Sequence, residues 1–241
     1  MGIKQKIKSL LPGAGLEPPI TCRHQEYSII ASLDDDPAGP SERLLDISLA
    51  TVGHARTMDL SEVSAHLSGP PYWPDVWPGE HYKLLAGLML AVQPELVVEI
   101  GTFTGLSALS MLKTLPTGSR IVTYDIFDWQ TIADTCLQKE DFSDGRLEQR
   151  IADLADPRIF AEQAGLLQKA DLFFIDGPKD IAFEQAFLHN LAGLEFARRP
   201  LLIFDDIRVW NMLRIWRGID RPKLDLTSFG HWSGTGLVDW C

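Results

Sequence analysis

Cysteine, basic side chains and long hydrophobic runs are all scarce in this sequence of 241 residues. The three cysteines, Cys22, Cys136 and Cys241, are far apart, which argues against a disulfide framework or a cysteine metal site and favours reduced thiols inside a cell. Lys and Arg total 22 against 33 Asp and Glu, a net charge of −11 that argues against nucleic-acid and anionic-membrane partners. Residues 1–11 are too polar for a signal or membrane segment, and a short amphipathic helix is expected there. These absences predict a cytoplasmic protein that acts on a small molecule.

Proline and glycine clusters divide the chain near residue 78. Residues 1–78 are irregular, with short helices expected at 42–49 and 59–67, and we predict an extension that packs over the site. Residues 79–241 alternate between helical and apolar segments, which predicts a doubly wound α/β domain with a mostly parallel sheet of seven strands. Helices are expected at 80–92, 129–137, 157–168, 180–197 and 209–217. Strands are expected at 96–100, 120–124, 147–151, 171–175, 201–204, 224–229 and 237–240, the last two as an antiparallel hairpin.

The run at residues 96–107 predicts a buried strand, a glycine turn and a helix start, which together form a nucleotide-binding geometry. Gly101 and Gly105 let a ligand approach the backbone. A dinucleotide site would require glycine where Phe103 stands, so a pyrophosphate ligand is disfavoured. Asp125 ends the next strand and is placed to accept hydrogen bonds from both ribose hydroxyls of a nucleoside ligand. That acid would also serve NAD, so the turn by itself leaves the cofactor open.

Four more aspartates follow later strands of the predicted sheet. Ligands of such sheets bind at the carboxyl ends of the strands, where these acids gather. Asp153 is placed to contact an adenine amino group. Asp176 ends the fourth strand and Asp205 and Asp206 end the fifth, so their oxygens should converge on one divalent cation. Hard oxygen ligands with room for water favour Mg²⁺, with Mn²⁺ or Ca²⁺ as alternatives.

The pattern of Glu99, Gly101 and Gly105, acid-x-Gly-x-x-x-Gly, resembles the first motif of class I methyltransferases that use S-adenosylmethionine (SAM). The antiparallel ending favours the same architecture over the dinucleotide one. A carboxylate such as Glu99 suits the positive sulfonium of that cofactor, and Ser107 matches a position that binds the methionine carboxylate, although a helix cap is an equally good role for it. The cofactor-binding residues that this resemblance implies are Glu99, Gly101, Thr102, Gly105, Ser107, Asp125 and Asp153.

The segment Asp176-Gly177-Pro178-Lys179, together with Asp205 and Asp206, resembles the metal site of Mg²⁺-dependent O-methyltransferases. In the catechol type, a lysine three positions after the first metal aspartate is the general base, which implies that role for Lys179. In the bacterial macrocin and mycinamicin type, an acidic pair follows the fifth strand, as here. Asp206 stands where the catechol type has Asn, so catechol-like acceptors are disfavoured. The resemblance covers about residues 79–241.

The resemblance implies a SAM-dependent O-methyltransferase that transfers a methyl group to a hydroxyl of a glycoside or another secondary metabolite. Asp176 and Lys179 are the expected catalytic residues, and His231 and Trp232 are weaker candidates for substrate contact. His81 and His189 are expected to be ordinary polar positions. A metal-independent N- or O-methyltransferase, a SAM-binding module without catalysis and, more distantly, an NAD protein remain as alternatives. Homo-oligomerisation is left open.

Overall fold

The computed structural model describes residues 38–209 and 211–240. The helix expected at residues 1–11, together with Cys22 and Cys241, lies outside this part of the chain. Among the described cysteines, Cys136 is free and buried. None of the helices in the described ranges is long and apolar enough to cross a membrane.

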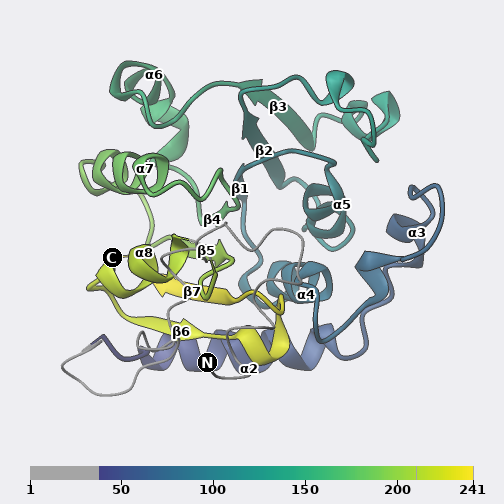
Figure 1. Cartoon of the computed structure of the whole chain (residues 1–241), viewed down its shortest axis with the longest axis horizontal. Helices are drawn as coiled ribbons and strands as arrows, with labels where there is room; N and C mark the ends of the chain where they lie inside the picture. The colour runs from purple at the N-terminus through teal and green to yellow at the C-terminus, as the bar shows by residue number, and fades with distance from the viewer. Residues whose placement is uncertain (1–37, 210, 241) are drawn as a thin grey trace, which may run out of the picture.

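A seven-stranded sheet runs through the centre of the molecule in the order β3-β2-β1-β4-β5-β7-β6 (Figure 1). The first five strands are parallel, and β7 is antiparallel to both β5 and β6. The prediction of a doubly wound, mostly parallel sheet with an antiparallel ending is therefore confirmed. The strands are β1 Leu96–Ile100, β2 Arg120–Asp125, β3 Leu147–Ile151, β4 Leu172–Ile175, β5 Leu201–Asp205, β6 Lys223–Asp225 and β7 Thr235–Asp239.

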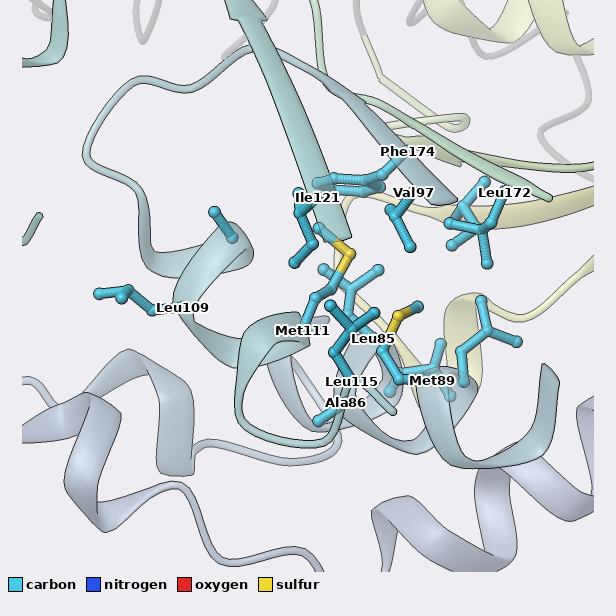
Figure 2. Close-up of a cluster of buried hydrophobic side chains, with 14 of the residues drawn as sticks. Leu85, Ala86, Met89, Val97, Leu109, Met111, Leu115, Ile121, Leu172 and Phe174 are labelled. Atoms are coloured by element: carbon cyan, nitrogen blue, oxygen red, sulfur yellow. The ribbon is translucent and has the colours of Figure 1, made fainter. Parts of the chain in front are cut away.

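The central strands are apolar because both of their faces are covered by helices. On one face α4 (Tyr82–Val92) and α5 (Leu106–Leu112) pack against alternate strand residues such as Val97 and Phe174, as the cluster in Figure 2 shows. On the other face lie α6 (Pro157–Leu167), α7 (Ala182–Ala192) and α8 (Met212–Gly218). The alternation of side chains along β1 therefore directs Glu99, like Val97, towards α4 and α5.

Several expected elements differ in length from the structure. The helix expected at 42–49 extends to Ala55, the one at 59–67 covers only Ser61–Ser64, and the one at 180–197 ends at Ala192. Two further elements differ more. The helix expected at residues 129–137 is only a single turn, η3 (Trp129–Thr131), begun by Asp128, whose side chain accepts a hydrogen bond from the Gln130 amide. The rest of this segment is tied to the glycine turn, because the Cys136 amide donates to the Thr104 carbonyl over 2.8 Å. The strand expected at 224–229 ends at Asp225, where a turn, η5 (Thr227–Phe229), begins with Thr227 bonded to the Asp225 carboxylate.

The described part of the N-terminal extension contributes to the core. Helix α2 (Glu42–Ala55) lies along α4 and buries Leu44 and Ala55 completely (Figure 1). Arg43 pairs over 2.6 Å with Asp239, a buried carboxylate at the end of β7. The elements α3 (Ser61–Ser64) and η2 (Trp73–Asp75) follow. A division at residue 78 stays a prediction, while the described extension packs mainly on one face of the sheet and reaches the cavity described next through Trp73.

Candidate active site

A cavity of about 950 Å³ opens at the carboxyl ends of the parallel strands. Its lining brings together the acids at the ends of β2, β3, β4 and β5, although Asp125 and Asp206 are 81 positions apart in the chain. The predicted site residues in its wall are Gly101, Asp125, Asp153, Asp176, Lys179, Asp205, Asp206 and His231. Glu99, Thr102, Gly105, Ser107 and Trp232 do not line it.

Both glycines of the turn after β1 are required by close packing. Gly101 has a φ of +98°, and a Cβ at this position would lie 2.2 Å from the Asp176 carbonyl oxygen. Gly105 has a φ of +83°, and its Cβ would lie 2.3 Å from Leu137 Cγ. Glycine at position 101 therefore allows the end of β1 to approach the start of the acidic loop after β4, as well as leaving the turn open to a ligand.

We expect Gly101→Ala to lower the free energy of unfolding by about 2–4 kcal/mol, because it combines an unfavourable φ with a backbone clash. Gly118→Ala is the matched control, since Gly118 has a φ of +85° with nothing within 4 Å of its Cβ position. The control should lose only about 1–2 kcal/mol. Urea denaturation of both variants measures the difference, and equal losses would show that the approach to Asp176 has no energetic consequence.

Asp125 holds the glycine turn in place and lines the cavity at the same time. One of its carboxylate oxygens accepts hydrogen bonds from the Thr102 and Phe103 amides, both over 3.0 Å. The other accepts from the Phe127 amide over 3.1 Å. Phe103, with a φ of +40°, exposes 68% of its surface at the mouth of the site. These bonds fix the carboxylate at the position where a nucleoside ligand is predicted to offer its hydroxyls.

Glu99 and Ser107 lie beneath the turn and bind each other. The Ser107 hydroxyl donates to Glu99 Oε1 over 2.5 Å, while Oε2 is buried without a hydrogen bond in the described structure. Burial, partly offset by hydrogen bonds, raises the pKa of Glu99 to about 7. Thr102, also buried, bonds to Thr123 over 2.8 Å. Contact of Glu99, Thr102 or Ser107 with a cofactor stays a prediction.

The raised pKa of Glu99 makes stability depend on pH. A carboxyl group that titrates at about 7 when folded and at 4.5 when unfolded binds protons more tightly in the folded state, so stability falls between these pH values as pH rises. We expect Glu99→Gln to remove this fall, with a gain over the wild type that grows by up to about 3 kcal/mol from pH 4.5 to pH 8. Denaturation in EDTA at several pH values tests this, with the exposed Glu140→Gln as control. A gain that does not change with pH would contradict it.

Three carboxylates meet where β4 and β5 end. Oxygen atoms of Asp176, Asp205 and Asp206 all lie within 4.8 Å of one another. Asp205 and Asp206 are buried, and Asp206 Oδ1 has no hydrogen-bond partner in the described structure. Asp206 has a φ of +59°, a conformation uncommon for residues other than glycine and typical of functional loops. Burial and the nearby Asp205 raise the pKa of Asp176. The predicted convergence of these acids is present.

Lys179 places its ammonium group against two of these carboxylates. Its Nζ pairs with Asp176 Oδ1 and, over 2.9 Å, with Asp206 Oδ2. Burial opposes the charged form, but the two carboxylates outweigh it and raise the pKa of Lys179. The backbone has a φ of +61° here, and the Lys179 amide donates over 2.8 Å to Glu184. Lys179 is therefore held as a cation in this arrangement, which is the opposite of what a general base requires.

Two histidines and a glutamate complete the site. His231 Nδ1 lies 3.1 Å from Asp205 Oδ1, and His81 Nδ1 lies 3.4 Å from the same oxygen. Glu80 Oε2 is 3.6 Å from His231 Nε2. Burial alone would lower the pKa of both histidines, but the Asp205 carboxylate raises the pKa of each. Burial alone would raise the pKa of Asp205, but the two histidines lower it.

His81, expected to be an ordinary polar position, is thus a buried member of the site. A sequence signal was available, because α4 runs antiparallel to the strand that follows it, so residues just before Tyr82 must lie at the carboxyl edge of the sheet. His231 lies in the cavity wall as expected for a substrate contact, whereas Trp232 is 68% exposed and outside it.

Residues 98–207 match the family model described as a methyltransferase domain. This stretch is a methyltransferase domain. It runs from β1 to the end of β5 and so contains the glycine turn, Asp125, Asp153, Lys179 and the acid cluster. His81 and His231 lie outside the matched stretch of the methyltransferase domain, although they contact its Asp205.

Solved structures similar to this chain include other methyltransferases. PaMTH1 of Podospora anserina, bound to S-adenosylhomocysteine (SAH), has 15% identity and a TM-score of 0.48 over 81% of this chain and 88% of its own. An O-methyltransferase of Bacillus cereus in complex with SAH has 19% identity and a TM-score of 0.48 over 78% of this chain and 88% of its own. MycE of the mycinamycin pathway, in complex with Mg and SAH, has 20% identity and a TM-score of 0.37 over 46% and 27%.

Proposed function

We propose that this methyltransferase domain uses SAM to methylate a hydroxyl group of a small molecule, assisted by a divalent cation. The observation that carries the proposal is that one cavity of about 950 Å³ contains both Asp125, at the glycine turn, and the acid cluster after β4 and β5. A cavity of this size is large for one drug-sized ligand, so it has room for a cofactor with an acceptor beside it.

Asp125 and Asp153 provide hydrogen-bond acceptors for the cofactor in one half of the cavity. Asp125 is fixed by three backbone amides yet faces the cavity, and one lone-pair site on Oδ1 remains for a ribose hydroxyl of SAM. The second ribose hydroxyl would share a carboxylate oxygen with one of these amides. Asp153, held by the Ala155 amide over 2.9 Å, lies in the same wall and is the proposed contact to the adenine amino group. The SAM sulfonium would then lie towards Asp176, since Gly101 adjoins that residue.

The acid cluster fits a hard divalent cation. Its donors are all carboxylate oxygens, and Asp206 Oδ1 is buried without a hydrogen bond in the described structure, 3.5 Å from His231 Nδ1. Asp176, Asp205 and Asp206 would hold Mg²⁺ or a similar ion, which supplies Lewis acidity that lowers the pKa of an acceptor hydroxyl. We therefore propose that the bound cation activates the acceptor hydroxyl.

The chain's own residues position the reactants for in-line displacement at the methyl carbon. Asp125 and the glycine turn orient the cofactor, and Asp176 faces both halves of the cavity. Lys179 can take the acceptor proton only if the negative charge of Asp176 and Asp206 is balanced by another cation, since those carboxylates now keep it protonated. The proposed acceptor is a hydroxyl of a glycoside or another secondary metabolite.

A metal-independent N- or O-methyltransferase is the second candidate. The observation that favours it is the Lys179 ammonium group, which already balances part of the charge of Asp176 and Asp206 without any metal. In that case the aspartates and Lys179 orient the acceptor, and a nitrogen nucleophile would need less activation than a hydroxyl.

Calorimetry with SAH, SAM and NAD tests the cofactor, and release of SAH from SAM in the presence of a library of hydroxyl and amine compounds tests the reaction. We expect SAH and SAM to bind, NAD to give no heat, and turnover with a hydroxyl compound to need a divalent cation. Full turnover in EDTA would favour the metal-independent candidate. Binding of SAM without turnover on any compound would favour a module without catalysis, and binding of NAD alone would refute the proposal.

A further inference from the structure

The segment before α4 and the loop before β7 together place two histidines over Asp205. The Trp232 amide donates to the Gly79 carbonyl over 2.9 Å, and the Gly79 amide donates to the Gly230 carbonyl over 3.1 Å. These bonds form a short parallel bridge between Gly79 and His231. The bridge fixes both histidines beside Asp205, the last residue of β5, although they are far apart in the chain.

The nitrogen and oxygen atoms of this group have the spacing of metal ligands. Donor atoms of His81, Asp205 and His231 all lie within 4.8 Å of one another, and Asp205 Oδ1 is 3.4 Å and 3.1 Å from the two Nδ1 atoms. Ligands of a tetrahedral zinc ion, each about 2.0–2.1 Å from the metal, are about 3.3 Å apart. The three side chains could therefore close around such an ion with little movement.

An independent observation indicates that a ligand belongs here. His81 is only 4% exposed, and its buried Nδ1 atom lies 3.4 Å from Asp205 Oδ1 without making a hydrogen bond within the described structure. A buried imidazole nitrogen left without a hydrogen-bond partner is destabilising, and a metal ion would satisfy it. His231 Nδ1 is in contact with the Ser233 hydroxyl over 2.7 Å, a bond that the hydroxyl can give up by rotating.

We propose that His81, Asp205 and His231 form a second cation site, selective for a transition ion such as Zn²⁺, beside the all-oxygen cluster of Asp176, Asp205 and Asp206. Two imidazoles and one carboxylate suit Zn²⁺ and neighbouring first-row ions, whereas three carboxylates suit Mg²⁺. All three side chains line the cavity, so the ion would keep an open position towards a small molecule. Asp205 belongs to both groups of ligands. The proposal does not depend on methyl transfer.

Titration of the metal-stripped full chain with Co²⁺, followed by visible absorption, tests this site without any reaction. We expect one equivalent to give the intense bands of tetrahedral nitrogen-ligated Co²⁺ and to raise the melting temperature. His231→Gln, which alters a loop residue, should weaken Co²⁺ binding at least about tenfold and abolish the melting shift. Asp176→Asn should keep the bands, because Asp176 belongs only to the all-oxygen cluster. His189→Gln, at an exposed position on α7, is the matched control.

His81→Gln should weaken Co²⁺ binding as His231→Gln does. If His81→Gln does not fold because His81 is buried, His231→Gln alone tests the site. Unchanged Co²⁺ binding in His231→Gln would overturn the proposal. So would loss of Co²⁺ binding in Asp176→Asn but not in His231→Gln, because the ion would then lie in the acid cluster. Absence of Co²⁺ binding would also overturn it, leaving the histidines as charge partners of Asp205. None of these results depends on whether the chain transfers a methyl group.

Discussion

Asp176→Asn should lower Mg²⁺-supported turnover by about 10³-fold, the largest effect that we expect from a single substitution. The size follows from removing a charged ligand whose metal contributes several kcal/mol of transition-state stabilisation. Asp176 also pairs with Lys179 and adjoins Gly101, so it faces both the acceptor and the cofactor halves of the cavity. Turnover is measured as SAH release with the acceptor that the library of hydroxyl and amine compounds identifies.

The cause of that loss can be separated from a general defect. Binding of Mn²⁺, followed by the electron paramagnetic resonance of the free ion, should weaken by at least about a hundredfold in Asp176→Asn, while SAH affinity changes little. Asp134→Asn, an exposed aspartate outside the cavity, is the control and should match the wild type in every assay. A loss of turnover smaller than tenfold, with Mn²⁺ binding intact, would contradict the metal role of Asp176.

Asp125→Ala should weaken SAH binding by about 10²-fold. Hydrogen bonds to charged groups contribute about 1.5–3 kcal/mol each, and the proposed contacts to the ribose number two, although water recovers part of that energy in the variant. The carboxylate also holds the Thr102 and Phe103 amides, so part of the loss could come from a loosened turn. Calorimetry with SAH measures the total, with the exposed Asp128→Ala on the same loop as control.

A second ligand separates the two contributions. The wild type should bind a 2′,3′-dideoxy analogue of SAH about as weakly as Asp125→Ala binds SAH itself. If Asp125 contacts the ribose, the variant should no longer distinguish SAH from the analogue, because the interaction is already gone. If the variant still prefers SAH by the wild-type factor, Asp125 acts only on the turn and the predicted ribose contact is wrong.

The central strands β1, β4 and β5 could be predicted from the sequence because each contains an apolar run, and few other environments accept such runs. The polar strand β3 carries no such run, and its prediction depended on the alternation of helices and strands. The acids that follow these strands could also be placed, since parallel strands end at one edge of a sheet. Asp176, Asp205 and Asp206 therefore converge as predicted. The antiparallel ending was predicted from the short spacing of the last two apolar segments, although β6 is shorter than expected.

Other features depend on contacts that local patterns do not contain. His81 joins the site through the bridge between Gly79 and His231, which links residues that are 152 positions apart. The role of Lys179 as the base stays a prediction, because its protonation depends on the positions of Asp176 and Asp206. The helix expected at 129–137 was wrong because Cys136 bonds to the backbone of the glycine turn instead. For His81 and Cys136, a long-range contact prevailed over the local pattern.

The most direct test of the account is a crystal structure of the chain with SAH and Mn²⁺, including an anomalous map for the metal. We expect SAH in the cavity with its ribose on Asp125, its sulfur towards Asp176, and an anomalous peak bound by the carboxylates of Asp176, Asp205 and Asp206. SAH bound outside this cavity, or bound with its sulfur directed away from Asp176, would contradict the proposed methyl transfer.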